Sequence, residues 1–270
     1  MLPNKRRSFP TPYDDVNSLL RYLETRIRLI LGSRFVGLYL YGSLALGDFD
    51  PSSSDIDLLV ATQTELSAEQ VEALHAMHEQ LDNSRSTWAG RIEAAYIPLE
   101  ALNGPAPAGA KYPQLEDLSE LYPAPLEAGW PFQRWTLRER GVVVSGPSPE
   151  TFTAPVGRDE LQQSALEILG GWQERVRRDL DWVDWIRHRA CMSFTVLTIC
   201  RSLYSLETGA VVSKPAAARW AQEALGPQWK GLVQRALAGM HVGGKIDEEE
   251  LQETLRFLDE AVERVRRAGG

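Results

Sequence analysis

The chain has few of the residues that build zinc centres or disulfide frameworks. It contains two cysteines and four histidines among 270 residues. Cys191 and Cys200 lie nine residues apart in a strongly helical segment, a spacing that suits neither a zinc site nor a disulfide, so we expect buried free thiols. The histidines show no metal-ligand spacing. These absences exclude the zinc-binding and disulfide-rich classes of domain.

Long apolar runs and an excess of positive charge are also missing. No stretch approaches the ~20 apolar residues that span a bilayer, and the basic segment 1–12 lacks the apolar core of a signal peptide, which predicts a cytoplasmic protein. The net charge is −8 at pH 7. Because no basic stripe follows the chain, neither a membrane nor long nucleic acid is an expected partner.

The negative charge is unevenly distributed. Residues 1–150 carry 13 Lys and Arg against 20 Asp and Glu, whereas the remainder is nearly neutral. A surface of this kind raises the local concentration of cations. It therefore favours a small cationic ligand.

The hydrophobic pattern divides the chain into two halves. Amphipathic helices alternate with β-rich runs up to residue 150, and almost everything from 158 onward has helical periodicity. We predict an α/β domain at 1–150, a mixed sheet with flanking helices, followed by an all-α domain at 158–270. The proline-rich stretch 98–130 is expected to be loop. Helices are predicted at 13–31 and 67–82, and strands at 34–41, 55–62, 91–98 and within 141–152.

The segment YGSLALGDFDPSSSDIDLLVAT, residues 41–62, combines a Gly-Ser turn with two carboxylates. Residues i and i+2 of a strand point to the same face, so Asp55 and Asp57 are expected side by side. Adjacent ionised carboxylates repel each other, and a divalent cation such as Mg²⁺ is the usual neutralising partner. Gly42 and Ser43 stand where the first strand gives way to a short helix, a place where backbone N–H groups approach a phosphate. The segment therefore predicts a phosphate site beside a metal site.

Gly-Ser followed after eleven residues by Asp-x-Asp resembles the signature of the polymerase-β-type nucleotidyltransferase superfamily. The resemblance implies a third carboxylate on a later strand, and Glu93 in RIEAAYIP occupies that place. The alternative is a surface glutamate on an edge strand. Residues 196–225 resemble the helical domain of the aminoglycoside adenylyltransferases that act on streptomycin and spectinomycin, and residues 141–156 resemble the segment before it.

The resemblance further implies that Arg201 and Lys214 bind the phosphates of ATP. Arg201 lies in a nearly apolar helix, where its charge is costly unless an anion neutralises it. Lys214 belongs to the first turn of the next helix, which also stabilises an anion. The alternative is that Arg201 pairs with a core carboxylate and that Lys214 is solvated.

The sequence contains fewer signals for the residues that bind the acceptor than for those that bind ATP. In the antibiotic enzymes, carboxylates and a tryptophan of the helical domain contact the drug, whereas this chain has Cys191 and Phe194 where polar contacts would be expected. Slightly upstream, DLDWVDWIRHR supplies an acidic and aromatic cluster that suits a polycationic sugar. Equally, tryptophans at i,i+3 fit a core with solvated aspartates around it. The cluster consists of Asp181, Trp182, Asp184 and Trp185.

Together these features predict an adenylyltransferase that uses Mg²⁺ and transfers AMP from ATP to a hydroxyl of a small cationic acceptor such as an aminoglycoside. Asp55 and Asp57 would bind the metal, and Glu93 would accept or position the hydroxyl proton. Gly42 and Ser43 would hold the triphosphate. Two alternatives stay open: a protein-adenylylating enzyme of toxin–antitoxin type, and a nucleotide-binding regulatory protein without turnover.

Overall fold

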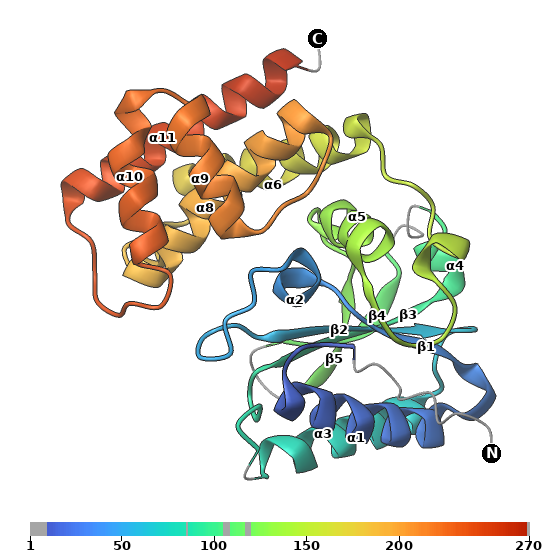
Figure 1. Cartoon of the computed structure of the whole chain (residues 1–270). Coiled ribbons are helices and arrows are strands. Elements are labelled where there is room, and N and C mark those ends of the chain that lie inside the picture. Colours follow the sequence, from blue (N-terminus) through green and yellow to red (C-terminus); the bar gives the residue numbers. More distant parts are fainter. Residues whose placement is uncertain (1–9, 85, 105–108, 117–119, 269–270) are drawn as a thin grey trace. The chain divides into compact units, whose positions relative to one another are not determined.

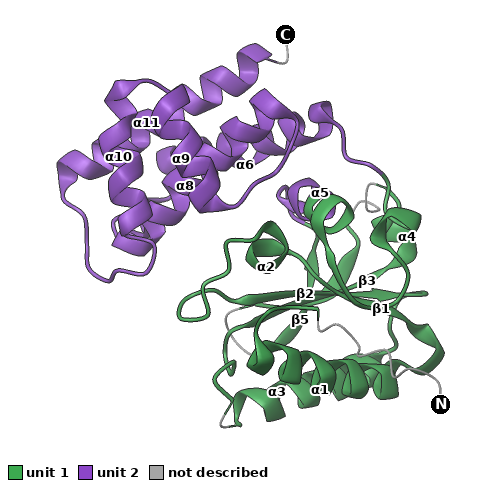
Figure 2. Cartoon of the chain, viewed as in Figure 1, with its two compact units in different colours: residues 1–126, 136–154 green, residues 127–135, 155–270 purple. Residues whose placement is uncertain are grey.

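The computed structural model describes residues 10–84, 86–104, 109–116 and 120–268. The basic segment 1–9, and Pro105 and Pro107 of the proline-rich stretch, lie outside the described residues. The chain forms two compact units (Figure 2), each with its own hydrophobic core. Unit 1 comprises residues 1–126 and 136–154, and unit 2 comprises residues 127–135 and 155–270.

The division between the units passes through one helix. The sequence predicted a first domain that runs without interruption to residue 150, but residues 127–135 cluster with the helical unit. These residues include the first part of α5 (Trp130–Arg140). The physical reason is Phe132, whose ring is buried in the core of unit 2.

Unit 1 is built on a six-stranded mixed sheet with the order β5-β4-β3-β2-β1-β6. The pair β2–β3 is parallel, and all other neighbouring strands are antiparallel. The predicted mixed sheet with flanking helices is therefore confirmed. The strands are β1 (Phe35–Leu40), β2 (Ile56–Thr62), β3 (Ile92–Pro98), β4 (Lys111–Leu115), β5 (Leu121–Pro125) and β6 (Val142–Ser145).

Alternate strand residues separate onto the two faces of this sheet. Ile56, Leu58 and Val60 of β2 join the core formed with α1 (Asp14–Leu31) and α3 (Ala68–Asp82), which cover one face (Figure 1). Because strand side chains alternate, Asp57 points to the opposite face. The short helices on that side are α2 (Gly42–Leu46) and α4 (Leu99–Leu102) (Figure 1).

The proline-rich stretch contains an antiparallel hairpin that the sequence analysis did not predict. β4 and β5 pair with Pro113 opposite Pro123, and β4 extends the sheet beside β3. Proline cannot donate a ladder hydrogen bond and is therefore found mainly on edge strands. β5 is such an edge. The expectation of loop was wrong for these two strands.

Unit 2 consists of helices, as predicted from residue 158 onward. Its central helix, α8, is buried over most of its length, and Gly209 ends it in the left-handed conformation, with φ of 70°. Cys200 is buried in this helix and Cys191 is half-buried. No helix in the described part of the chain is both long and apolar enough to span a membrane. The helices are α6 (Arg158–Arg178), α7 (Leu180–Ile186), α8 (Arg189–Thr208), α9 (Lys214–Ala224), α10 (Pro227–Ala238) and α11 (Glu248–Ala268); short 3-10 turns, η1 (Gly32–Arg34) and η2 (Pro149–Thr151), occur in unit 1.

Candidate active site

Two of the three predicted catalytic carboxylates stand on neighbouring strands. β2 and β3 run parallel with Asp57 paired to Glu93, so both side chains lie on the same face of the sheet. Neighbouring strands are about 4.8 Å apart, which places the two carboxylates within reach of one small ligand. Asp55 precedes β2 and is exposed, whereas Asp57 and Glu93 are half-buried.

The loop that leads into β2 is held by Arg91. The Arg91 guanidinium donates hydrogen bonds to the carbonyl oxygens of Pro51, at 3.0 Å, and of Ser54. The Arg91 carbonyl oxygen in turn accepts the N–H of Ile56 at 2.9 Å. Asp55 lies between Ser54 and Ile56, so its backbone is fixed on both sides by the same arginine.

The Gly-Ser turn contacts the Asp57 side chain directly. Gly42 has a φ of 58°, and a Cβ at this position would lie 1.9 Å from Oδ2 of Asp57. Both the left-handed backbone and the missing side chain are therefore required. Ser43 follows in α2, and its hydroxyl makes no hydrogen bond to any described residue, which leaves it able to bind a phosphate oxygen.

The carboxylate pair belongs to a lateral row that crosses four strands. On one side, the N–H of Tyr41 donates to the carbonyl oxygen of Asp57 at 3.2 Å. On the other side, the antiparallel register of β3 and β4 continues to place Glu116 beside Glu93. Burial raises the pKa of Tyr41 well above its ordinary value, and the charges of Asp57, Glu93 and Glu116 raise it further. Sequence reasoning missed Glu116 because β4, the strand that it follows, was taken for loop.

The carboxylates Asp55 and Asp57 fit a magnesium site that ATP helps to complete. In the described ranges, no group of three or more His, Cys, Asp or Glu side chains could hold a metal ion by itself. Asp55 and Asp57 suit Mg²⁺, which is commonly held by one or two carboxylates and completes its shell with phosphate oxygens and water. The packing of Asp57 against Gly42 brings this carboxylate to the turn expected to bind the phosphates.

In unit 2, the two predicted phosphate ligands each lie over an aromatic ring. The Arg201 guanidinium is 5.9 Å from the centroid of Phe132, and Lys214 Nζ is 4.2 Å from the centroid of Phe194. Both cations are half-buried. Lys214 is the first residue of α9, and the Ser213 side chain caps that helix by accepting a backbone N–H.

The predicted acceptor residues divide between core and surface. Trp182 is buried in the core of unit 2 and stacks on Trp185, with centroids 6.2 Å apart. Trp185 is 39% exposed. Asp181 is exposed, and Asp184 lies 3.5 Å from Lys245 Nζ. The structure thus gives Trp182 a core role, while Trp185 and Asp181 remain accessible to a ligand.

Phe194 connects the two predicted groups of unit 2. Its ring meets that of Trp185 edge-on at 6.1 Å and also supports the Lys214 ammonium. The ring is 41% exposed. The sequence analysis treated Phe194 as a departure from the expected polar contacts; the structure shows it between a predicted acceptor residue and a predicted phosphate ligand.

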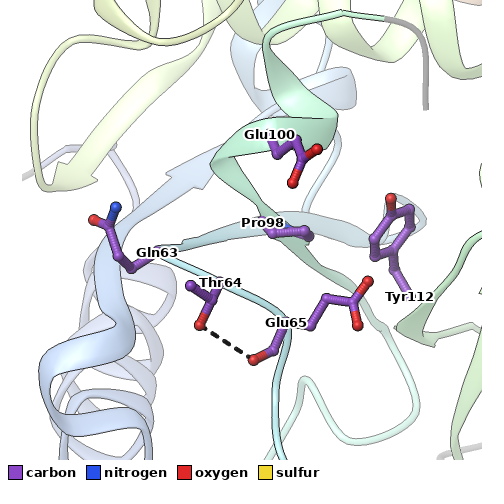
Figure 3. A pocket seen from close by; sticks show the side chains of 6 residues that line it. All are labelled: Gln63, Thr64, Glu65, Pro98, Glu100 and Tyr112. Carbon is purple, nitrogen blue, oxygen red and sulfur yellow. Dashed lines mark hydrogen bonds between the residues drawn. The ribbon is translucent and has the colours of Figure 1, made fainter. Parts of the chain in front are cut away.

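Unit 1 also contains a cavity of about 320 Å³, whose lining residues are shown in Figure 3 and include Glu65, Glu100 and Tyr112. It opens at the carboxyl ends of β2 and β3, whereas Asp57 and Glu93 stand near the amino ends. Burial raises the pKa of Tyr112 in its wall, and the charges of Glu65 and Glu100 raise it further. We therefore do not assign the phosphate site to this cavity.

Comparison with known proteins identifies both units. The family described as nucleotidyltransferase domain matches residues 24–88, and the aminoglycoside adenylyltransferase C-terminal domain matches residues 153–267. The chain thus combines a match to a nucleotidyltransferase domain with a match to the C-terminal domain of the aminoglycoside adenylyltransferases. It is therefore an enzyme of the adenylyltransferase type, as the sequence predicted.

Curated relatives agree with this assignment, and a solved structure shares the fold. The chain is 28% identical over 214 residues to aminoglycoside (3'') (9) adenylyltransferases of Klebsiella pneumoniae and Escherichia coli, covering 74% of this chain and 76% of each relative. Its fold is similar to the crystal structure of spectinomycin adenyltransferase AAD(9) from Enterococcus faecialis with ATP and spectinomycin. The TM-score is 0.69 at 14% identity, over 93% of this chain and 99% of the other.

Proposed function

We propose that the chain transfers AMP from ATP to a hydroxyl group of an aminoglycoside-type antibiotic. The observation that carries the proposal is the pairing of Asp57 with Glu93 beside the Gly42 turn, which assembles metal-binding and proton-accepting groups on one sheet face. The names of the relatives, which act on aminoglycosides, support the choice of acceptor. Because ATP is consumed, we place the reaction in the cytoplasm.

The reaction is a substitution at the α-phosphorus of ATP. The acceptor hydroxyl oxygen forms a bond to this phosphorus while the bond to the bridging β-phosphate oxygen breaks, and pyrophosphate leaves with that electron pair. The proton of the hydroxyl passes to the Glu93 carboxylate. Glu93 is suited to this role because it stands one strand away from the proposed metal ligand Asp57.

The remaining groups neutralise and orient the triphosphate. Mg²⁺ bound by Asp55 and Asp57 would offset the charge that develops on the phosphate oxygens. The Gly42 backbone and the Ser43 hydroxyl would bind phosphate oxygens. Arg201 and Lys214 are kept as proposed phosphate ligands on the resemblance of their segment to the helical domain of the aminoglycoside adenylyltransferases, whose C-terminal domain matches residues 153–267.

The acceptor is proposed to be cationic and hydroxylated. Exposed rings of Trp185 and Phe194 offer π-faces to an ammonium or guanidinium group. The Asp181 carboxylate is also exposed, one helical turn before Trp185 in α7. The match of residues 153–267 to an aminoglycoside adenylyltransferase domain favours a small molecule over the protein acceptor left open by the sequence. The regulatory alternative lacks support, since both matched families are enzymatic.

The proposal is tested by incubating the whole chain with Mg²⁺ and ATP and a panel of aminoglycosides and unrelated hydroxylated metabolites. We expect an AMP-sized mass gain on streptomycin or spectinomycin, together with pyrophosphate release. Asp55→Asn and Asp57→Asn should abolish both signals while the fold stays intact. Expression in a sensitive bacterium should raise tolerance to the modified drug. Absence of any adenylylated aminoglycoside would contradict the proposed acceptor.

A further inference from the structure

Glu116 is the outermost carboxylate of the row that contains Asp57 and Glu93. Continued one residue beyond the end of β4, the register of β3 and β4 places it beside Glu93 on the side away from Asp57. The field of its charge reaches Tyr41 at the other end of the row. Since adjacent strands are about 4.8 Å apart, Glu116 lies roughly 5 Å from Glu93 and twice that from Asp57.

The Glu116 carboxylate is oriented but not neutralised. Its Oε2 accepts a hydrogen bond from the Tyr122 hydroxyl at 3.0 Å. Across the described ranges, no Lys, Arg or His forms an ion pair with it, and the side chain is exposed. A neutral phenol fixes the direction of the carboxylate and leaves its charge available.

Tyr41 stands at the opposite end of the row. Its side chain is only 7% exposed; burial raises its pKa, and the charges of Asp57, Glu93 and Glu116 all raise it further. The row of three carboxylates therefore acts as one negative surface of the sheet.

We propose that Glu116 binds the cationic group of the acceptor and thereby selects ammonium- or guanidinium-bearing acceptors. The inference rests on the proposed function. In that reaction the phosphates of ATP lie beside Asp57, and the attacking hydroxyl lies beside Glu93. The rest of the acceptor molecule therefore extends toward Glu116. A positive group roughly 5 Å from the reacting hydroxyl meets this carboxylate. Glu116 is a specificity residue and takes no part in proton transfer.

The test compares Glu116→Gln with the wild-type chain in steady-state kinetics on streptomycin and spectinomycin. The amide preserves shape and can still pair with Tyr122, so only the charge is lost. We expect the KM of the acceptor to rise roughly 10- to 100-fold, the range for a hydrogen bond to a charged group. The KM of ATP and kcat should change less than threefold, and Glu116→Asp should recover part of the affinity.

A matched control removes an equal charge elsewhere in unit 1. Glu100→Gln lies at the opposite ends of the strands, in the wall of the cavity described above. It should leave the acceptor KM unchanged. An equal rise in both variants would show that only the general negative field attracts the acceptor, and would overturn the specific role of Glu116.

Direct binding separates this inference from the proposed function. Calorimetry of each drug against the chain, with Mg²⁺ and a non-hydrolysable ATP analogue present, measures acceptor affinity without turnover. Binding that Glu116→Gln weakens, without AMP transfer by the wild type, would support Glu116 and contradict the proposed reaction. Binding that the variant leaves unchanged would overturn Glu116 alone. No binding of either drug would contradict both.

Discussion

The Asp57 carboxylate packs directly against the α-carbon of Gly42. A Cβ at position 42 would come within 1.9 Å of Oδ2 and 2.4 Å of Cγ, so no other residue fits without moving the acid. The Gly-Ser turn therefore has a steric role in addition to its proposed contact with phosphate: it fixes where the proposed metal ligand stands.

Gly42→Ala should disable the enzyme by displacing Asp57. The substitution strains a left-handed backbone by about 1 kcal/mol and also pushes the carboxylate aside. A shift of about 1 Å can reduce the rate by ~10²-fold, and we expect at least that loss in kcat. Gly47→Ala is the control, because Gly47 has a φ of 79° but nothing within 4 Å of an added Cβ. Equal losses of activity in the two variants would contradict the steric role.

Glu93→Gln should separate chemistry from binding. The amide keeps the size of the side chain but cannot accept the hydroxyl proton, so kcat should fall by ~10²–10⁴. The dissociation constant of ATP with Mg²⁺, measured by calorimetry, should stay within about threefold of the wild type if Glu93 does not hold phosphate. A kcat close to that of the wild type would remove Glu93 from the mechanism.

Phe194→Leu should weaken ATP binding through Lys214. The ring lies 4.2 Å from Lys214 Nζ, so the substitution removes a cation–π contact that helps to position the ammonium. We expect ATP affinity to fall roughly 2- to 30-fold, and Lys214→Ala to cause a larger loss that shrinks at high salt. Tyr204→Leu removes another aromatic side chain from α8, one that packs on Trp220, and should leave ATP affinity unchanged.

His78 should make unit 1 sensitive to acid. Its Nε2 lies 2.7 Å from the Tyr96 hydroxyl, and burial lowers the pKa of His78 to about 4. Because the unfolded chain binds this proton near pH 6.5 and the folded chain does not, stability is lost as pH falls from about 6.5 toward 4.

The histidine contribution should amount to about 2 kcal/mol between pH 7.5 and 5. The His78→Gln variant keeps a hydrogen-bonding nitrogen near Tyr96, but its side chain does not titrate. The free energy of opening unit 1 should therefore depend less on pH in this variant than in the wild type. Hydrogen exchange of β3 amides at the two pH values measures this for unit 1 alone. The same pH dependence in both proteins would assign the acid sensitivity to other groups.

Local patterns of apolar residues in the sequence were sufficient to predict most helices and strands of the fold. The strands around Asp57 and Glu93 follow from alternating or continuous apolar residues, and the helices of unit 2 from helical periodicity ended by glycines such as Gly209. The pairing of Asp57 with Glu93 could not be read from the sequence. Register between strands that are not joined by a tight turn is decided by packing across the whole sheet.

Two features of the candidate site could not be predicted from the sequence, for physical reasons. Glu116 follows a strand that contains Pro113 and faces Pro123, and prolines argue against strands unless the position at a sheet edge is known. Phe194 looked unsuitable because a phenyl ring cannot bind a polar drug by hydrogen bonds. Its contacts with Lys214 and Trp185 depend on how three helices pack, which periodicity alone does not specify.

The edge position of β5 affects how copies of the protein associate at high concentration. An exposed sheet edge normally invites a strand from a neighbouring molecule, because its unpaired N–H and C=O groups can continue the ladder. On β5, neither Pro123 nor Pro125 has an N–H to donate. A strand added there would find gaps in the ladder, so this edge of the sheet resists polymerisation and amyloid-like stacking.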